Sequence, residues 1–195
     1  MLIMKRASTL KAIGYLIVLS LLLTGCQQFS EAEIDRSAGL NGGFEISKNN
    51  LPVNWAMYTP NTVPDANFKI ELDKENFVEG KQSLKFEVTT CKDIGGWLSP
   101  GFTNQFHEVG SFKGKGTYKV SFWIMNKESK FRISAGGVSP KLGEMNTLLE
   151  GDSNITEWQL QEFNIDIPKD MELRLELNIL KPGTFWIDNI QVEKL

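Results

Sequence analysis

Apolar residues alternate with polar ones along most of this chain, in short runs separated by glycine, proline, asparagine and aspartate. Successive side chains of an extended strand point to opposite faces of a sheet, so a period of two indicates a strand with one buried face. After Phe44 no apolar period of 3.6 continues for three turns, as an amphipathic helix would require. The sequence therefore predicts an all-β protein in which two antiparallel sheets pack as a β-sandwich.

Four of these runs carry an uninterrupted apolar row on one face, and such rows interdigitate when two sheets pack. The expected core rows are Leu84, Phe86 and Val88; Tyr118, Val120, Phe122 and Ile124; Phe131, Ile133 and Ala135; and Leu173, Leu175, Leu177 and Ile179. The expected strands cover residues 43–46, 55–58, 67–72, 82–89, 96–99, 116–125, 130–136, 146–150, 157–167, 171–180 and 184–193.

The alternation breaks twice, and an extra residue in a β-bulge restores the phase of a strand after such a break. One break falls in 157–167, where the apolar set shifts between Leu160 and Phe163, and it predicts a bulge at Gln161-Glu162. The other falls in the last strand and predicts a bulge at Asp188-Asn189. A bulge re-aims a side chain, and here that side chain is the carboxylate of Asp188.

The partner that we expect for Asp188 lies near the start of the predicted domain. There, Gly42-Gly43 allows a close approach of two backbones, and Glu45 adds a second carboxylate. The first and last segments of the domain are therefore predicted to meet.

Five short motifs follow one another along the chain. They are Asn41-Gly42-Gly43-Phe44-Glu45, Gly80-Lys81-Gln82-Ser83-Leu84-Lys85, Thr117-Tyr118-Lys119-Val120-Ser121-Phe122-Trp123, Trp158-Gln159 and Phe185-Trp186-Ile187-Asp188-Asn189-Ile190. In this order they resemble the carbohydrate-binding modules of families 4, 9 and 22. The resemblance covers roughly residues 39–195 and implies a galactose-binding-like jelly roll that binds a polysaccharide or oligosaccharide.

The beginning of the chain is typical of an exported protein. Lys5, Arg6 and Lys11 precede an apolar run that is short for a membrane-spanning helix, which is the pattern of a signal peptide. Leu23-Thr24-Gly25-Cys26 matches the lipobox of bacterial lipoproteins, which implies cleavage before Cys26 and lipidation of its sulfur. We therefore expect a signal peptide at 1–25, a lipidated tether at 26–38 and one β-sandwich domain at 39–195. Acyl chains such as palmitate would then hold the protein at the cell envelope, with the lipid as its only contact with the membrane.

Charge and residue content exclude several function classes. Removal of the three basic residues of the signal peptide leaves 18 basic against 24 acidic side chains, a net charge of −6 that disfavours nucleic acid. The single histidine, His107, excludes a multi-histidine metal site. With Cys26 lipidated, Cys91 has no disulfide partner, and we expect a buried thiol.

Glu172 and Glu176 are the acids whose spacing most resembles the carboxylate pair of a glycoside hydrolase. Arg174 stands between them and would keep such carboxylates ionised, which disfavours a general acid. We therefore expect no enzyme. For Arg174 and Glu176 two interpretations remain: they form part of a charged sheet face, or they contact a ligand.

Binding residues are expected on the faces opposite the core rows. Trp123 and Arg132 lie on such faces of neighbouring predicted strands, and an aromatic plane beside a guanidinium suits a sugar ring and its hydroxyls. The resemblance implies aromatic ligand contacts at Trp97 and, less directly, at Trp123. The alternative is that loops cover both rings and that they serve packing.

The resemblance also implies a structural Ca²⁺ that joins the two ends of the domain. Its ligands would be the carboxylates of Glu45 and Asp188, completed by backbone carbonyls near Gly43 and at Lys81. In the alternative, Asp188 caps backbone amides at its bulge without a metal.

The sequence thus predicts a non-catalytic cell-envelope lipoprotein that binds carbohydrate through one face of its sandwich. The alternative is a structural or assembly lipoprotein that uses the same sandwich to bind an envelope protein.

Overall fold

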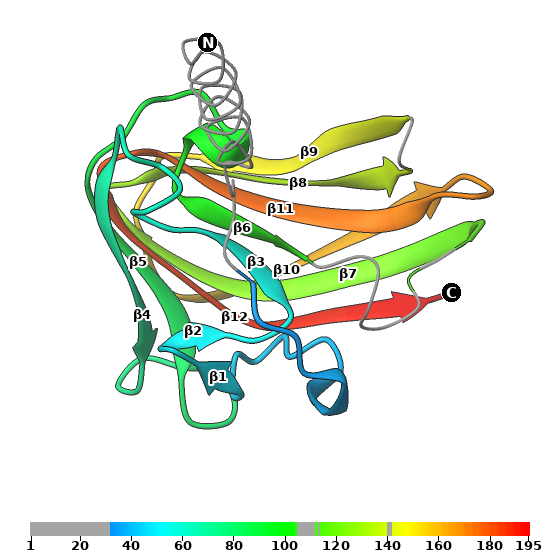
Figure 1. Cartoon of the computed structure of the whole chain (residues 1–195), viewed down its shortest axis with the longest axis horizontal. Coiled ribbons are helices and arrows are strands. Elements are labelled where there is room, and N and C mark those ends of the chain that lie inside the picture. Colours follow the sequence, from blue (N-terminus) through cyan, green and yellow to red (C-terminus); the bar gives the residue numbers. More distant parts are fainter. Residues whose placement is uncertain (1–31, 105–111, 113, 140–141) are drawn as a thin grey trace, which may run out of the picture.

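The computed structural model describes residues 32–104, 112, 114–139 and 142–195 as two five-stranded antiparallel sheets (Figure 1). The first sheet has the order β10 (Ile155–Ile167), β7 (Gly116–Lys127), β12 (Gly183–Lys194), β5 (Ser83–Thr90) and β4 (Asn67–Asp73). The second has the order β3 (Trp55–Tyr58), β6 (Gly101–Asn104), β11 (Glu172–Lys181), β8 (Lys130–Val138) and β9 (Gly143–Gly151). The predicted all-β sandwich is confirmed.

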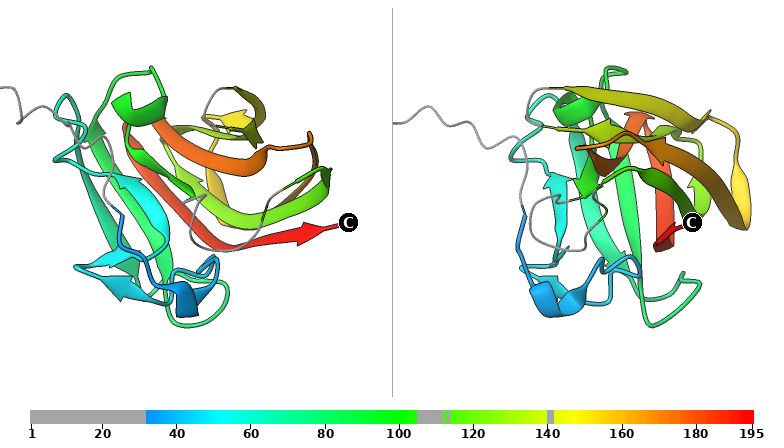
Figure 2. Two further views of the ribbon diagram at one scale, coloured as in Figure 1. Left: turned by 45° about the vertical axis from the view of Figure 1, so that its right-hand side comes forward. Right: turned by 90° about the vertical axis from the view of Figure 1, so that its right-hand side faces the viewer.

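Three small elements complete the described part of the chain. The hairpin of β1 (Ser47–Lys48) and β2 (Leu51–Pro52) lies beside the 3₁₀ turn η1 (Arg36–Ala38) at one end of the sandwich (Figure 2). A second 3₁₀ turn, η2 (Gly96–Leu98), lies between β5 and β6. Within the described ranges no helix is long and apolar enough to cross a membrane. The predicted signal peptide, Cys26 and the first part of the tether lie outside the described residues.

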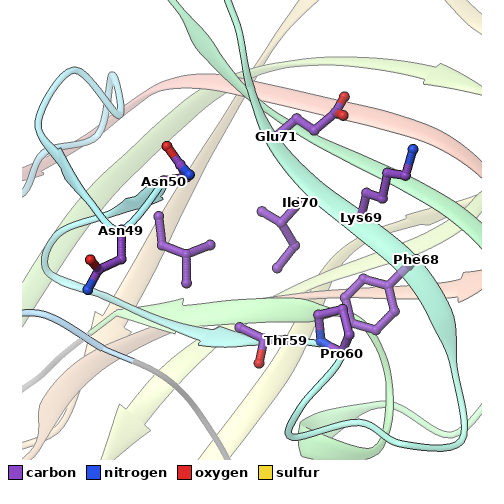
Figure 3. A pocket seen from close by; sticks show the side chains of 9 residues that line it. Asn49, Asn50, Thr59, Pro60, Phe68, Lys69, Ile70 and Glu71 are labelled. Carbon is purple, nitrogen blue, oxygen red and sulfur yellow. The ribbon is translucent and has the colours of Figure 1, made fainter.

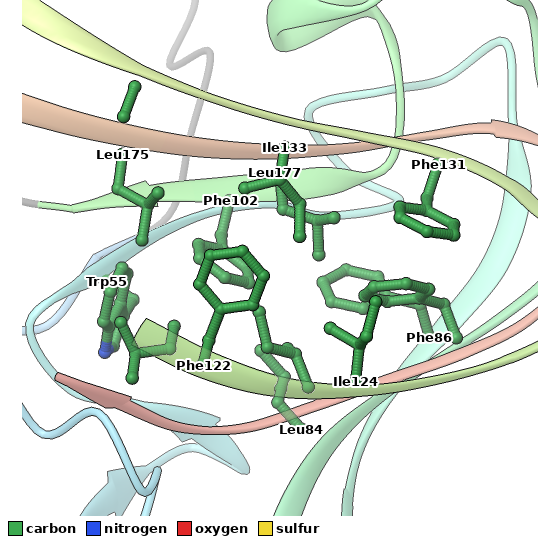
Figure 4. Close-up of a cluster of buried hydrophobic side chains, with 14 of the residues drawn as sticks. Trp55, Leu84, Phe86, Phe102, Phe122, Ile124, Phe131, Ile133, Leu175 and Leu177 are labelled. Atoms are coloured by element: carbon green, nitrogen blue, oxygen red, sulfur yellow. The ribbon is translucent and has the colours of Figure 1, made fainter. Parts of the chain in front are cut away.

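The core lies between the two sheets, and all four predicted apolar rows are buried in it (Figure 4). Phe122 and Ile124 of β7 face Ile133 of β8 and Leu177 of β11 across this layer. Trp55 fills one end of the core, and its ring meets that of Phe102 edge to face at 4.9 Å. Cys91 is a free thiol that packs against the core and is only partly buried, whereas the sequence predicted a buried thiol.

The structure corrects two of the predicted strands. Residues 43–46 form a turn, because Phe44 adopts a positive φ of 57° that a strand does not allow. Residues 96–99 form η2 and its end, because Gly95 and Gly96 both take positive φ angles. The sequence also missed β1, β2 and β6, which are too short to show a clear alternation.

One of the two predicted bulges is confirmed and the other is wrong. The pairing of β12 with β7 shifts between Asp188 and Gln191, as the phase break at Asp188-Asn189 predicted. The pairing of β10 with β7 runs without a shift from Gln159 to Ile167, so no bulge lies at Gln161-Glu162. The apolar residues of β10 change phase there because Leu160 belongs to the outer face, whereas Phe163 packs against the core.

The two ends of the domain meet at Gly42, as predicted. Its carbonyl oxygen accepts the N–H of Ile190 at 2.9 Å, within the bulge of β12 between Asp188 and Gln191. A Cβ atom on Gly42 would lie 1.8 Å from the carbonyl oxygen of Ile190, whereas one on Gly43 would have its nearest contact at 3.7 Å, on the Glu45 side chain. Only the first of these two glycines is therefore required by the close approach.

We expect Gly42→Ala to lower the free energy of unfolding by about 3 kcal/mol, at the upper end of overpacking effects, because backbone rather than a flexible side chain must move. The neighbouring substitution Gly43→Ala is the matched control and should change stability by less than about 1 kcal/mol. Chemical denaturation of both variants measures the difference. Equal stabilities for the two would contradict the closure at Gly42.

Candidate functional site

Three of the predicted binding residues lie together on the outer face of the second sheet. Arg174 and Glu176 project from β11, and Arg132 projects from the neighbouring β8. Core residues alternate with them on both strands, which fixes their outward direction. Along the rows that cross this face, Glu176 pairs with Thr103 and Ser134, and Asn178 pairs with Gly101 and Arg132.

Trp97 joins this face because η2 is bonded to β11. The side-chain amide of Asn178 accepts the N–H of Gly96 at 3.0 Å and donates to the Gly96 carbonyl at 3.1 Å. A Cβ on Gly95 would lie 3.2 Å from Nη1 of Arg132, so η2 also touches the guanidinium. Trp97 remains 50% exposed. The structure therefore places the turn that carries Trp97 beside the Arg132 guanidinium, with Asn178 holding the turn.

Arg174 is the centre of one hydrogen-bonded group on this face. Its guanidinium forms an ion pair with Glu176 at 2.7 Å, donates to Oγ1 of Thr103 at 3.2 Å, and donates to the hydroxyl of Tyr58 at 3.3 Å. Burial, followed by the negative charge of Glu176, raises the pKa of Tyr58 to about 12. Tyr58 therefore stays protonated at ordinary pH. The planar fork of Arg174 is fixed in one orientation by these contacts.

A second ion-pair group lies on the same face, where β8 pairs with the edge strand β9. Arg132 Nε donates to Glu150 at 2.7 Å, and Lys130 pairs with both Glu150 and Asp93. The hydrogen bond from Arg132, followed by that from Lys130, lowers the pKa of the Glu150 carboxyl. Both cations of this group are thus matched by carboxylates.

Trp123 does not belong to this cluster. It lies on β7 of the first sheet, opposite Leu160 of β10 and Asp188 of β12. The expectation that Trp123 stands beside Arg132 is wrong, because β7 and β8 follow each other in the chain but belong to different sheets. Alternation fixed the outward direction of both residues without fixing the sheet. Ligand binding by Trp123 stays a prediction, on the opposite face of the sandwich.

The sequence missed three polar residues of the site, namely Tyr58, Thr103 and Asn178. Asn178 continues the outward polar series of Arg174 and Glu176 on β11, so its position was visible in the alternation. Tyr58 and Thr103 stand on four-residue strands, where alternation gives little signal. Their place beside Arg174 depends on the pairing of β3 with β6 and of β6 with β11.

A separate hollow of about 360 Å³ opens beside β4, the edge strand of the first sheet (Figure 3). Leu51, Pro60, Phe68 and Ile70 form its apolar surface. The polar residues that line it come from the β1–β2 turn, from Thr59 after β3 and from β4: Asn49, Asn50, Thr59, Lys69 and Glu71. None of the predicted binding residues lines this hollow.

The two carboxylates of the predicted calcium site, Glu45 and Asp188, lie near each other, but both accept hydrogen bonds from backbone amides. Asp188 is fully buried, and it accepts the N–H of Val78 at 2.7 Å, of Glu79 at 3.3 Å and of Asn189 at 2.7 Å. Burial raises the pKa of the Asp188 carboxyl, these three N–H groups oppose the rise, and the charge of Glu45 adds to it.

The donor set around Glu45 does not fit a calcium sphere of six to eight oxygens. Glu45 Oε1 accepts the N–H of Lys81 at 2.8 Å and of Gln82 at 3.3 Å, so Lys81 presents a donor where a carbonyl ligand was expected. In the described part of the chain no group of three or more His, Cys, Asp or Glu could hold a metal. The hydrogen bonds agree with the amide-capping alternative, and calcium at Glu45, Asp188, Gly43 and Lys81 stays a prediction.

The fold is similar to that of several solved structures. The xylan-binding domains CBM22-1 and CBM22-2 of Paenibacillus barcinonensis Xyn10C both superpose with a TM-score of 0.55, at 12% and 16% identity. The alignments cover 78% and 79% of this chain and 91% and 98% of those domains. The chain has the fold of a family 22 carbohydrate-binding module. The predicted galactose-binding-like jelly roll is thereby confirmed.

A further family 22 module agrees with this assignment of the fold. The C-terminal module of Clostridium thermocellum Xyn10B superposes with a TM-score of 0.54 at 16% identity, over 83% of this chain and 96% of the module. No family model matches the sequence, and no curated protein matches it either. The family 22 likeness is therefore one of fold, carried by sheet topology at low identity.

We expect Asp188→Ala to lower the free energy of unfolding by about 3 kcal/mol, because buried N–H groups of Val78, Glu79 and Asn189 would lose their acceptor. Thermal melting of the unmutated and mutated domains, each with chelator and with added calcium, measures both roles of this carboxylate. A melting temperature that falls with chelator only in the unmutated domain would support the predicted metal. An unmutated domain indifferent to chelator and calcium would leave amide capping as the whole role of Asp188.

Proposed function

We propose that this chain is a non-catalytic module that binds carbohydrate on the outer face of the second sheet. The observation that carries the proposal is the cluster on that face, where the turn that holds half-exposed Trp97 lies against Arg132 and Glu176, and Glu176 is paired with Arg174. The fold supports it, since solved structures of the same fold include xylan-binding domains.

The chemistry of the cluster suits a neutral, hydroxyl-rich ligand. The plane of an indole packs against the apolar face of a pyranose ring, and fixed guanidinium donors and carboxylate acceptors bond to the hydroxyls. Arg174 and Arg132 each have a carboxylate partner, at 2.7 Å in both cases, so neither arginine provides an unmatched charge for an anionic ligand. The site therefore favours an uncharged polysaccharide or oligosaccharide.

The same contacts disfavour glycoside hydrolysis. A hydrolase needs one carboxyl group that is protonated and donates to the leaving oxygen. Glu176 is instead ion-paired with the Arg174 guanidinium at 2.7 Å, so its carboxylate is already engaged as an acceptor. Binding without catalysis is the function that this pairing supports.

The proposal places the module at a bacterial cell envelope, through the lipobox and the predicted lipidation of Cys26. The short tether would keep the binding face near the membrane while allowing it to reorient. In this position the module would hold glycan chains close to the cell surface.

A glycan array and affinity gels with soluble polysaccharides test the proposal on the chain from Gln27 to Leu195. Xylan is the first probe, because the compared family 22 domains are described as xylan-binding. Retardation or capture by at least one uncharged polysaccharide is expected. Binding to none of them, together with a stable complex with an envelope protein after crosslinking, would favour the protein-binding alternative.

Trp97→Ala should weaken glycan binding about tenfold or more, as expected when an aromatic anchor worth roughly 2 kcal/mol is removed. Leu98→Ala is the matched control, because Leu98 lies on the same 3₁₀ turn and is 49% exposed against 50% for Trp97. Isothermal titration measures affinity, and thermal melting checks that both variants fold. Equal affinity of the two variants would remove Trp97 from the site.

Arg132→Ala should weaken binding several-fold and leave the fold intact. The stability change should stay within about 1 kcal/mol, because the ion pair is partly exposed and Glu150 retains Lys130 at 3.1 Å. Titration with the same glycan and a denaturation curve measure the two effects. An affinity equal to that of the unmutated chain would show that Arg132 does not contact the ligand.

A further inference from the structure

The outer face of the first sheet carries an apolar band on the side opposite the candidate site. Trp123 on β7 pairs with Leu160 on β10, and the next outward residue of β7, Met125, pairs with Trp186 on β12. Leu160 is 44% exposed, and the rings of Trp123 and Trp186 are half-buried. The band therefore crosses three adjacent strands and presents two indole rings on a sheet surface.

The band is narrow and has defined ends. The distance from β10 to β12 is two strand spacings of about 4.8 Å each. At the β12 end, Asp188 binds the amides of Val78 and Glu79, which brings the loop between β4 and β5 onto this face. Trp186 is fixed there by a hydrogen bond of 2.8 Å from Nε1 to Asp73. A strip of this width fits one extended chain better than a protein interface, which takes about 800 Å² from each partner.

The charged residues around the band neutralise one another. Lys119 pairs with Glu162 on β10, and Lys85 pairs with Glu71 at 3.0 Å and with Glu87 at 3.6 Å. With these charges matched, the face offers no positive field for nucleic acid or for an anionic lipid surface. The remaining recognition chemistry is that of rings and neutral hydrogen-bonding groups.

Neutral polar groups border the rings on the next row of the sheet. Ser121 and Gln191 pair with each other across β7 and β12, one outward position from Trp123. The hydroxyl of Ser121 has no hydrogen-bond partner among the described residues, and Gln191 donates to the side chain of Asn189 at 2.9 Å. Indole faces beside hydroxyl and amide groups are the combination that binds the apolar and polar sides of a sugar ring.

We infer that this band is a second carbohydrate-binding surface, centred on Trp123, for an uncharged glycan chain that crosses β10, β7 and β12. The inference takes the class of ligand from the proposed function. It goes beyond that function by adding a second binding site. The module then has two binding faces on opposite sides of one core. A lipid-anchored module of this kind would bridge two glycan chains.

Isothermal titration of the chain from Gln27 to Leu195 with xylohexaose, cellohexaose and mannohexaose tests this inference. The unmutated chain should bind two molecules of a hexasaccharide, and Trp97→Ala and Trp123→Ala should each bind one. The double variant should bind none. Leu142→Ala, which removes a 68% exposed side chain on the β8–β9 hairpin, is the control and should still bind two.

Ser121→Arg provides a second test that keeps the indole, since a long charged side chain beside Trp123 should block only this face. It should reduce the stoichiometry from two to one and leave the melting temperature within a few degrees. If Trp123→Ala loses its cooperative melting transition, this variant alone decides the result.

Three outcomes would overturn the inference. A stoichiometry of one in the unmutated chain, abolished by Trp97→Ala, would reject the second surface and leave the proposed function intact. If the unmutated chain binds nothing on the whole glycan array, both the second surface and the proposed function are rejected. Sedimentation that shows self-association of the unmutated chain, lost in Ser121→Arg, would assign the band to a second copy of the protein instead.

Discussion

The packing of two sheets on one apolar layer is the constraint on which the rest of this structure depends. Each core row, such as Leu173 to Ile179 on β11, forces the residues between its members to face outward. The polar series that contains Arg174 and Glu176 is therefore placed by the burial of its apolar neighbours. Because the core fixes the strands, it also fixes the spacing at which these groups stand on the outer face.

The contact between the two domain ends is the second constraint, and it holds one edge of the same apolar layer. Gly42 and Ile190 bring the first segment onto β12, and the buried Asp188 ties the β4–β5 loop to the same place. Contacts between residues so far apart in the chain must offset the entropy lost in closing the loop between them. This end of the sandwich therefore holds its shape through backbone hydrogen bonds that a few side chains complete.

The charges on both outer faces are arranged in a similar way. Arg174 pairs with Glu176 and Arg132 pairs with Glu150 on one side, and Lys119 pairs with Glu162 on the other. These ion pairs hold the long side chains in place and leave no unmatched charge among them. The attraction for ionic partners is therefore low, and directed hydrogen-bonding groups remain on the faces that carry the tryptophans. Both faces are thus suited to ligands that carry hydroxyls without net charge.

The sequence by itself determined the fold class, the core rows, the bulge at Asp188 and the outward direction of the site residues, because a period of two is a local property of each strand. It did not determine which strands share a sheet. Trp123 and Arg132 are near in sequence and both face outward, yet the chain passes from one sheet to the other between β7 and β8. Tyr58, Thr103 and Asn178 reach Arg174 and Trp97 only through strand pairing across long stretches of chain. Those pairings are set by how the apolar rows of distant strands fit together, and that is a property of the packed core.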